Sequence, residues 1–326
     1  MPDIPEDWAL PRTLQPQAAA YAYDLDQALA SVLALTAEIP DDAFTASILG
    51  TERVGSGVLI REDGVVLTIG YLVTEAENVT LKTGDGRAVA GHVLGYDHAT
   101  GLGLVQALEP LDLPALRVGD SRDLAPGDSV VMAAGGGGRA RAMRSRLQAR
   151  QEFAGYWEYL LEEALFTAPA HPLWSGAAVI GASGELVGVG SLQMEQRSDD
   201  GRFMPLNMSV PAELLTPIFD DLVSGRATGS PRPWLGLLSQ EVDEAVVAVG
   251  VTKGGPASRA EMREGDVIVG VGGTPVSDLA SFYRRLWALG PAGVDVPLTL
   301  KRGSDVFDVE VRSADRRQLL KKPRYN

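Results

Sequence analysis

The sequence predicts a mostly β protein with two domains. A chain of 326 residues is long enough for about two domains, and 45% hydrophobic with 22% charged residues is ordinary for a globular protein. Short apolar segments alternate with glycine-rich turns between about residues 32 and 189. A stretch rich in Ser, Gly and Pro at 224–233 then divides the chain. Together these observations favour a β-sandwich or closed barrel followed by a second domain.

The N-terminal 22 residues are rich in Pro and Ala and predict a tail that is partly docked on the body. Trp8 and Tyr21 are the apolar side chains that could dock it, and an oligomerisation arm is the alternative. Residues 23–27 could form a helical turn or the end of this tail.

The strands of the first domain are expected where apolar runs flank a turn. Val79 to Lys82 faces Val89 to Val93 across Gly84-Asp85-Gly86, and Asp-Gly between apolar runs is a strong hairpin signal. The other strands are expected at 32–36, 58–60, 65–67, 130–134, 177–180 and 186–189.

A helix is expected to close the first domain. It would begin at Val210 and run to Val223, because Leu214, Ile218 and Leu222 lie one helical turn apart. The second domain is expected to begin at Trp234, after the linker.

The composition excludes several classes of function. A net charge of −14, with a pI near 4.7, opposes binding to nucleic acid or to an anionic membrane surface. With no cysteine, the chain has no disulfide, cysteine-bound zinc or thiol catalysis, and nothing indicates a cofactor. No run approaches the roughly 18 apolar residues of a membrane span. The first residues lack the basic region of a signal peptide, so we expect a cytoplasmic protein.

Three short segments carry the main functional signal: Val65 to Val73, Gly95 to Leu104 and His171 to Ile180. Their order and spacing resemble the HtrA/DegP-like family, whose members join a trypsin-like serine protease domain to a PDZ domain. The resemblance covers about residues 28–315. It implies a trypsin-like double β-barrel at 23–223, a linker at 224–233, an α+β PDZ domain at 234–315 and a C-terminal tail at 316–326.

The resemblance also implies a degenerate catalytic triad. Ser175 matches the nucleophile, whereas Tyr71 stands at the position of the base histidine and Gly101 at that of the aspartate. A serine hydroxyl needs a base that a third group orients, and a tyrosine with a pKa of about 10 stays protonated near pH 7. Leu173 replaces the glycine of the family's oxyanion loop. We therefore expect a homologue of serine proteases that has lost proteolytic activity.

Two other functional hypotheses stay open at this point. An active serine endopeptidase could use Ser175 with a rearranged base, either His171 or His98. A pure assembly protein would instead contact partners through its barrel and keep the PDZ groove closed.

The second domain resembles a PDZ module over nearly its whole length. Trp234-Leu235-Gly236-Leu237 is similar to the family's carboxylate-binding loop, and Gly255-Pro256-Ala257 and 265–273 are similar to its core. The resemblance implies that backbone NH groups hold a terminal carboxylate while a peptide adds a strand beside residues 237–239. On an expected helix at 278–289, Leu279 and Phe282 could line the pocket for the last side chain, with Tyr283 and Leu286 in the core.

The implied function is a peptide-binding adaptor or chaperone-like scaffold in protein quality control. Its partners would be C-terminal peptides or unfolded proteins, and the family segment before the barrel implies a homo-oligomer, a trimer.

Two further motifs are weaker. Gly135 to Gly138 lacks the Lys-Ser/Thr ending of a phosphate loop and is followed by Arg139, Arg141, Arg144, Arg146 and Arg150. We interpret it as a flexible turn with solvated arginines, and a basic patch for a partner is the alternative. The aromatic run Tyr156 to Tyr159 is expected to pack internally, although exposed aromatics also favour interfaces.

Overall fold

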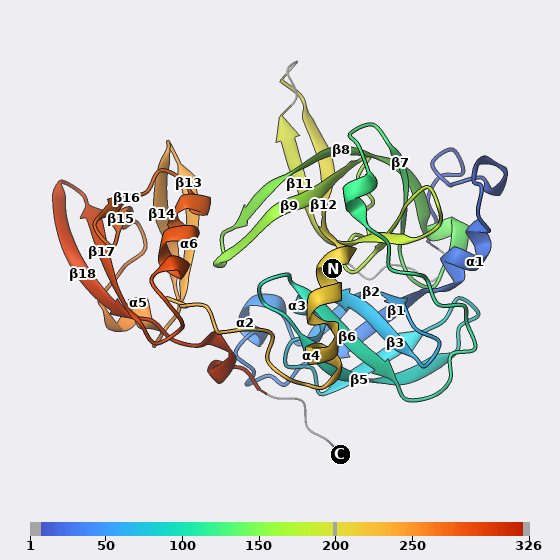
Figure 1. Cartoon of the computed structure of the whole chain (residues 1–326), viewed down its shortest axis with the longest axis horizontal. Coiled ribbons are helices and arrows are strands. Elements are labelled where there is room, and N and C mark those ends of the chain that lie inside the picture. Colours follow the sequence, from blue (N-terminus) through green and yellow to red (C-terminus); the bar gives the residue numbers. More distant parts are fainter. Residues whose placement is uncertain (1–7, 198–200, 322–326) are drawn as a thin grey trace. The chain divides into compact units, whose positions relative to one another are not determined.

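The computed structural model describes residues 8–197 and 201–321, and the chain separates into two compact units (Figure 1). The barrel unit comprises residues 1–151, 163–228 and 321–326. The C-terminal unit combines residues 229–320 with a short piece of the first domain, residues 152–162. That short piece is called the hairpin tip below.

The first barrel closes from six antiparallel strands in the order β1-β2-β3-β6-β5-β4. β3 is buried at every position, and the register pairs its residue Leu67 with Val58 of β2 and Leu104 of β6. The strands are β1 (Val32–Glu38), β2 (Glu52–Leu59), β3 (Val65–Ile69), β4 (Asn78–Lys82), β5 (Ala88–Tyr96) and β6 (Leu102–Ala107).

The second barrel has the order β10-β11-β12-β9-β8-β7, so the predicted double barrel is confirmed. A core cluster inside it includes Val130, Met132 and Val187, and Trp174 packs against this cluster. The strands are β7 (Ser129–Ala133), β8 (Ala142–Gly155), β9 (Tyr159–Ala168), β10 (Ala178–Ile180), β11 (Leu186–Arg197) and β12 (Phe203–Pro211).

The helix expected from Val210 to Val223 is wrong in its first part. β12 continues to Pro211, a 3-10 helix η4 (Ala212–Ile218) follows, and only α4 (Phe219–Val223) is an α-helix. Pro217 lies inside η4, and a proline has no backbone NH for the hydrogen bonds of a regular α-helix.

The start of the described chain is docked on the barrel unit. The Leu10 NH donates to the Ala140 carbonyl at 2.8 Å, and Leu10 is buried. Residues 23–27 contain a helix start, because Asp24 caps α1 (Leu25–Ala30) through the Gln27 NH. The other short helices here are η1 (Ala18–Ala20), α2 (Ala46–Leu49), α3 (Gly70–Val73), η2 (Ser121–Asp123) and η3 (Gly138–Arg141).

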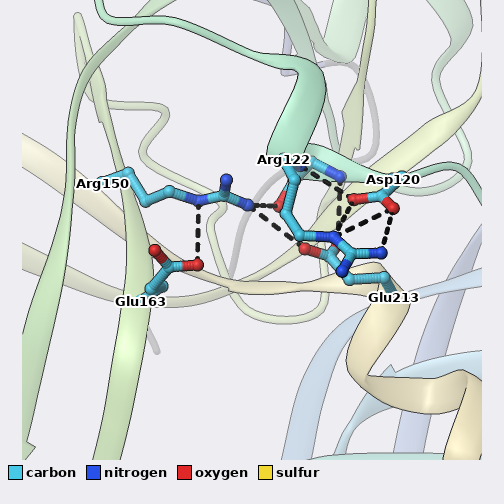
Figure 2. Close-up of polar contacts among 6 residues, drawn as sticks. Asp120, Arg122, Arg150, Glu163 and Glu213 are labelled. Atoms are coloured by element: carbon cyan, nitrogen blue, oxygen red, sulfur yellow. Dashed lines mark hydrogen bonds and ion pairs between the residues drawn. The ribbon is translucent and has the colours of Figure 1, made fainter.

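Arg150 is not a solvated arginine, contrary to the expectation for this region. Figure 2 shows its side chain between Glu163 of β9 and Glu213 of η4. Arg150 Nε lies 3.7 Å from Glu163 Oε2, and Arg150 Nη2 lies 3.2 Å from Glu213 Oε1. Glu213 also accepts hydrogen bonds from the NH and hydroxyl of Ser121. The Arg150 side chain is only 14% exposed, so this cluster joins β8, η4 and the segment between the barrels. Arg139 pairs with Asp26 at the surface, since the two side chains are 43% and 60% exposed.

The C-terminal unit is a sheet in the order β13-β14-β15-β17-β18, with β16 paired to β15 and a capped helix α6. The Asp278 side chain accepts a hydrogen bond from the Ser281 NH and caps the start of α6. The helix is one residue shorter at each end than the predicted helix at 278–289. The elements are β13 (Leu237–Val242), β14 (Ala245–Val251), α5 (Pro256–Arg259), β15 (Val267–Val271), β16 (Thr274–Pro275), α6 (Leu279–Ala288), β17 (Asp295–Arg302), β18 (Asp305–Arg312) and η5 (Arg316–Leu319).

The core of this unit contains Leu160 of the hairpin tip together with Leu279 and Phe282, and Ala154 packs against the cluster. The sequence did not indicate this sharing of core residues, because residues 163–228 separate the hairpin tip from the rest of the unit along the chain.

Candidate functional site

Ser175 lies in the loop before β10 and its hydroxyl contacts Tyr71 of α3. The two side-chain oxygens are 2.8 Å apart, and the Tyr71 OH donates to the Ser191 carbonyl, also at 2.8 Å. A carbonyl can only accept, so the single phenol proton points to Ser191 and the Ser175 hydroxyl is the donor to Tyr71. Ser175 is thus held by a hydroxyl partner and is only 3% exposed.

The phenol of Tyr71 cannot remove a proton from Ser175 near neutral pH. Burial raises the pKa of Tyr71 above its ordinary value of 10.0, and the hydrogen bond with Ser175 opposes this only in part. The phenol is therefore protonated, and it already directs its proton elsewhere.

The backbone around Ser175 is tightly packed. Its carbonyl accepts from the Ser56 NH at 2.8 Å, and a Cβ on Gly55 would lie 2.7 Å from the same carbonyl oxygen. Gly176 has a φ of +71°, and a Cβ there would meet the Ser56 carbonyl at 2.0 Å. Glycine is needed at both positions for this close approach of β2.

Gly101 forms a tight turn beside the start of α3. Its NH donates to the Asp97 carbonyl at 2.8 Å, and its carbonyl accepts from the Gly70 NH at 2.7 Å. The φ of Gly101 is +79°, in the left-handed region that favours glycine. The neighbouring Asp97 carboxylate accepts from the Thr100 NH and from the Thr228 hydroxyl, so it is used within the turn and its surroundings.

Leu173 donates its backbone NH to the ring of His171, at 2.9 Å from Nδ1. The other ring nitrogen, Nε2, lies 3.1 Å from the Arg141 carbonyl and must donate to it. Burial lowers the pKa of His171 to about 4, opposed by the bond to Arg141, so the ring is neutral with its proton on Nε2. Both ring nitrogens are engaged inside the loop, and the Leu173 NH is turned to His171.

The other histidine considered as a base, His98, lies edge-on to the ring of Tyr96 with centroids 4.8 Å apart. Within residues 8–197 and 201–321, no cluster of three or more His, Asp or Glu side chains could hold a metal ion. None of the helices in that part of the chain has the length and apolar character of a membrane span.

The loop expected to hold a carboxylate contacts one from the same chain. The Gly236 and Leu237 NH groups donate to Oε1 of Glu158 at 2.8 and 3.0 Å, and the Leu235 NH donates to Oε2 at 3.0 Å. Gly236 has a φ of +77°, which turns the three NH groups to one side. Trp234, just before the loop, is tied to Ala314 by two backbone hydrogen bonds of 3.0 Å. Sequence reasoning missed Glu158, which lies in the aromatic run 156–159.

Comparison with known proteins matches the chain to two domain families. The trypsin-like peptidase domain family matches residues 55–189, and the PDZ domain family matches residues 233–312. The chain therefore combines a trypsin-like peptidase fold with a C-terminal PDZ domain.

The similar proteins support the HtrA/DegP-like resemblance. A protein of Halomonas elongata named "Probable periplasmic serine endoprotease DegP-like" is 28% identical over 275 residues, covering 80% of this chain and 56% of its own. A protein of Synechocystis named "Putative serine protease HhoA" is 28% identical over 289 residues, covering 81% of this chain and 71% of its own. The chain spans about half the length of the DegP-like relatives it matches. Their names contain the word periplasmic, so they do not support the cytoplasmic location expected above.

Solved structures show the same fold. A variant of the HtrA-type protease AlgW, solved with a tripeptide, has a TM-score of 0.55 at 20% identity; the match covers 92% of this chain and 97% of the variant's chain. A serine endoprotease from Yersinia pestis has a TM-score of 0.50 at 20% identity, covering 89% and 95%.

Proposed function

We propose that this protein is a proteolytically inactive HtrA-like homologue that binds peptides through its PDZ domain, as an adaptor or chaperone-like scaffold. The observation that carries the proposal is the hydrogen bond between Ser175 and the protonated phenol of Tyr71. A nucleophilic serine must lose its proton to a base, and this partner cannot accept one. In this proposal Gly101 supplies no orienting group.

The position of Leu173 supports the same proposal. An oxyanion site needs NH groups that point to where the negative oxygen develops, and the Leu173 NH instead donates to His171. Losing one such donor costs on the order of 10²–10³ in turnover in known enzymes. The loop therefore adds a second defect to the missing base.

The rival function is an active serine endopeptidase with a rearranged base. It is favoured by the presence of Ser175 and by the relatives' names as serine proteases. The geometry of His171 counts against it, because both ring nitrogens already have partners other than Ser175.

Chemical labelling of Ser175 distinguishes these two functions. We expect no reaction with a fluorophosphonate probe beyond that of a Ser175→Ala variant, and no cleavage of unfolded casein, because the loss of a catalytic base costs on the order of 10⁶ in turnover. The extent of labelling is measured by intact-protein mass spectrometry. Stoichiometric labelling that depends on Ser175 would refute the proposal that the protein is proteolytically inactive.

Peptide titration tests the binding function of the PDZ domain. The full chain should bind peptides that end in an apolar residue with a free carboxylate, and amidation of the terminus should weaken binding about tenfold or more, because charged hydrogen bonds contribute roughly 1.5–3 kcal/mol each. Gly236→Val should abolish this difference, since valine does not tolerate a φ of +77°. Equal affinities of free-acid and amidated peptides, measured by calorimetry, would rule out carboxylate capture.

A further inference from the structure

The hairpin tip presents Glu158 to the carboxylate-binding loop in the manner of a ligand. The three NH groups of Leu235, Gly236 and Leu237 all donate to this one carboxylate. These contacts lie within the C-terminal unit, to which residues 152–162 belong. The same three donors cannot hold a second carboxylate at the same time.

A backbone hydrogen bond beside the loop is a second feature that the hairpin tip shares with a bound peptide. The Ser239 NH donates to the Tyr156 carbonyl at 2.8 Å. β13, which contains Ser239, is an edge strand paired only with β14 in the sheet order, so the hairpin tip contacts its open edge. Carboxylate capture combined with hydrogen bonds to an open strand edge is how an added peptide strand is recognised.

Contacts with α6 hold the tip in place. The Tyr283 hydroxyl donates to the Gly155 carbonyl at 2.8 Å and accepts from the Glu158 NH at 3.3 Å. Leu160 is 8% exposed and belongs to the core of the unit. Glu158 itself has a φ of +59°, a backbone conformation that is unfavourable for a residue with a side chain. The surrounding contacts compensate for this unfavourable backbone conformation.

We infer that residues 155–158 are an internal ligand of the PDZ domain, with the Glu158 side chain in the place of a terminal carboxylate, and that an external peptide binds only by displacing them. This inference rests on the proposed peptide-binding function. It predicts that the apparent affinity for a peptide equals the intrinsic affinity multiplied by the fraction of molecules whose loop is open. A tethered ligand acts at a high effective concentration, so weakly binding peptides are excluded.

Binding of the Glu158 side chain to the NH groups of residues 235–237, called seating here, should depend on pH. Burial raises its pKa from 4.5 to about 7, opposed by the loop NH groups and by Arg316; the facing Tyr283 has a pKa raised by burial and by Glu158. A carboxyl group whose pKa is raised in the seated state stabilises seating below its ordinary pKa and loses this effect as the pH rises through about 7. Peptides should therefore displace the tip more easily at pH 8 than at pH 6.

The first experiment measures hydrogen exchange of the loop without any peptide. Replacing Glu158 by alanine removes the acceptor, so the NH groups of residues 235–237 should exchange about tenfold faster or more. Glu162→Gln, an exposed glutamate of the same tip, is the matched control and should change nothing. Amides of β14 and β15 must keep their protection, which separates opening of the tip from unfolding. Unchanged exchange of residues 235–237 in Glu158→Ala would overturn the inference.

The second experiment titrates a free-acid peptide into the same variants. Glu158→Ala should bind about tenfold more tightly than the wild type or Glu162→Gln. Between pH 6 and 8 the wild-type affinity should rise about tenfold relative to that of Glu158→Ala, whereas Glu158→Gln, neutral at every pH, should show no such change. Equal affinities of wild type and Glu158→Ala would contradict internal competition and leave peptide binding intact. Faster exchange without any peptide binding would instead refute the adaptor function and favour a closed-groove assembly protein.

Discussion

Tyr71→His combined with Gly101→Asp should restore no casein cleavage above the background of Ser175→Ala, although it returns the two missing triad residue types. An imidazole is shorter than a phenol, so a histidine on the same backbone does not reach the point where the Tyr71 hydroxyl meets Ser175. An aspartate at position 101 must adopt a φ of +79°. The Leu173 NH, moreover, still donates to His171.

The assay compares single-turnover cleavage by the double variant with that by the same variant carrying Leu173→Gly. Glycine at 173 lets the loop turn its NH outward, so any recovered activity should appear only in the triple variant. Robust cleavage by the double variant alone would show that the oxyanion site is intact and that only the triad is lost.

Arg53→Met should lower the stability of the barrel unit by about 3–5 kcal/mol, the range for removing one member of a buried charged network. Arg53 is 4% exposed and donates to the carbonyls of Tyr71 and Thr74, at 2.6 and 3.0 Å, and to the Thr45 hydroxyl. Methionine would leave these carbonyls without their donor. It would also remove the positive charge of Arg53 from the neighbourhood of the buried Glu75 carboxylate, whose attraction partly opposes the lowering of the pKa of Arg53 by burial.

Differential scanning calorimetry measures the effect, which corresponds to a fall in melting temperature of about 6–20 °C for a unit of this size. Arg61→Met is the matched control: Arg61 and its partner Asp63 are 52% and 56% exposed, so it should cost less than about 1 kcal/mol. Equal melting temperatures for the two variants would show that the network around Arg53 does not contribute to stability.

Local sequence patterns located most of the fold. The predicted hairpin from 79–82 to 89–93 lies within β4 and β5, because a turn with Asp-Gly and alternating apolar residues depend only on near neighbours. The same patterns predicted α6 to within one residue, since its capping residue and apolar stripe are local. The sequence was less informative for η4, where an apolar stripe at helical spacing does not show that the segment folds as a 3-10 helix around Pro217.

The sequence by itself determined which residue types stand at the candidate sites: a serine without histidine or aspartate at the matching positions, and a glycine at the centre of the loop predicted to bind a carboxylate. Only the tertiary structure decided what these groups contact. That the Tyr71 hydroxyl accepts from Ser175, and that Leu173 donates to His171, depends on how the loop folds. The contact of Glu158 with residues 235–237 joins segments that are far apart in the sequence, with Leu235 lying 77 positions after Glu158. Such contacts arise from packing between distant segments, and no local pattern encodes them.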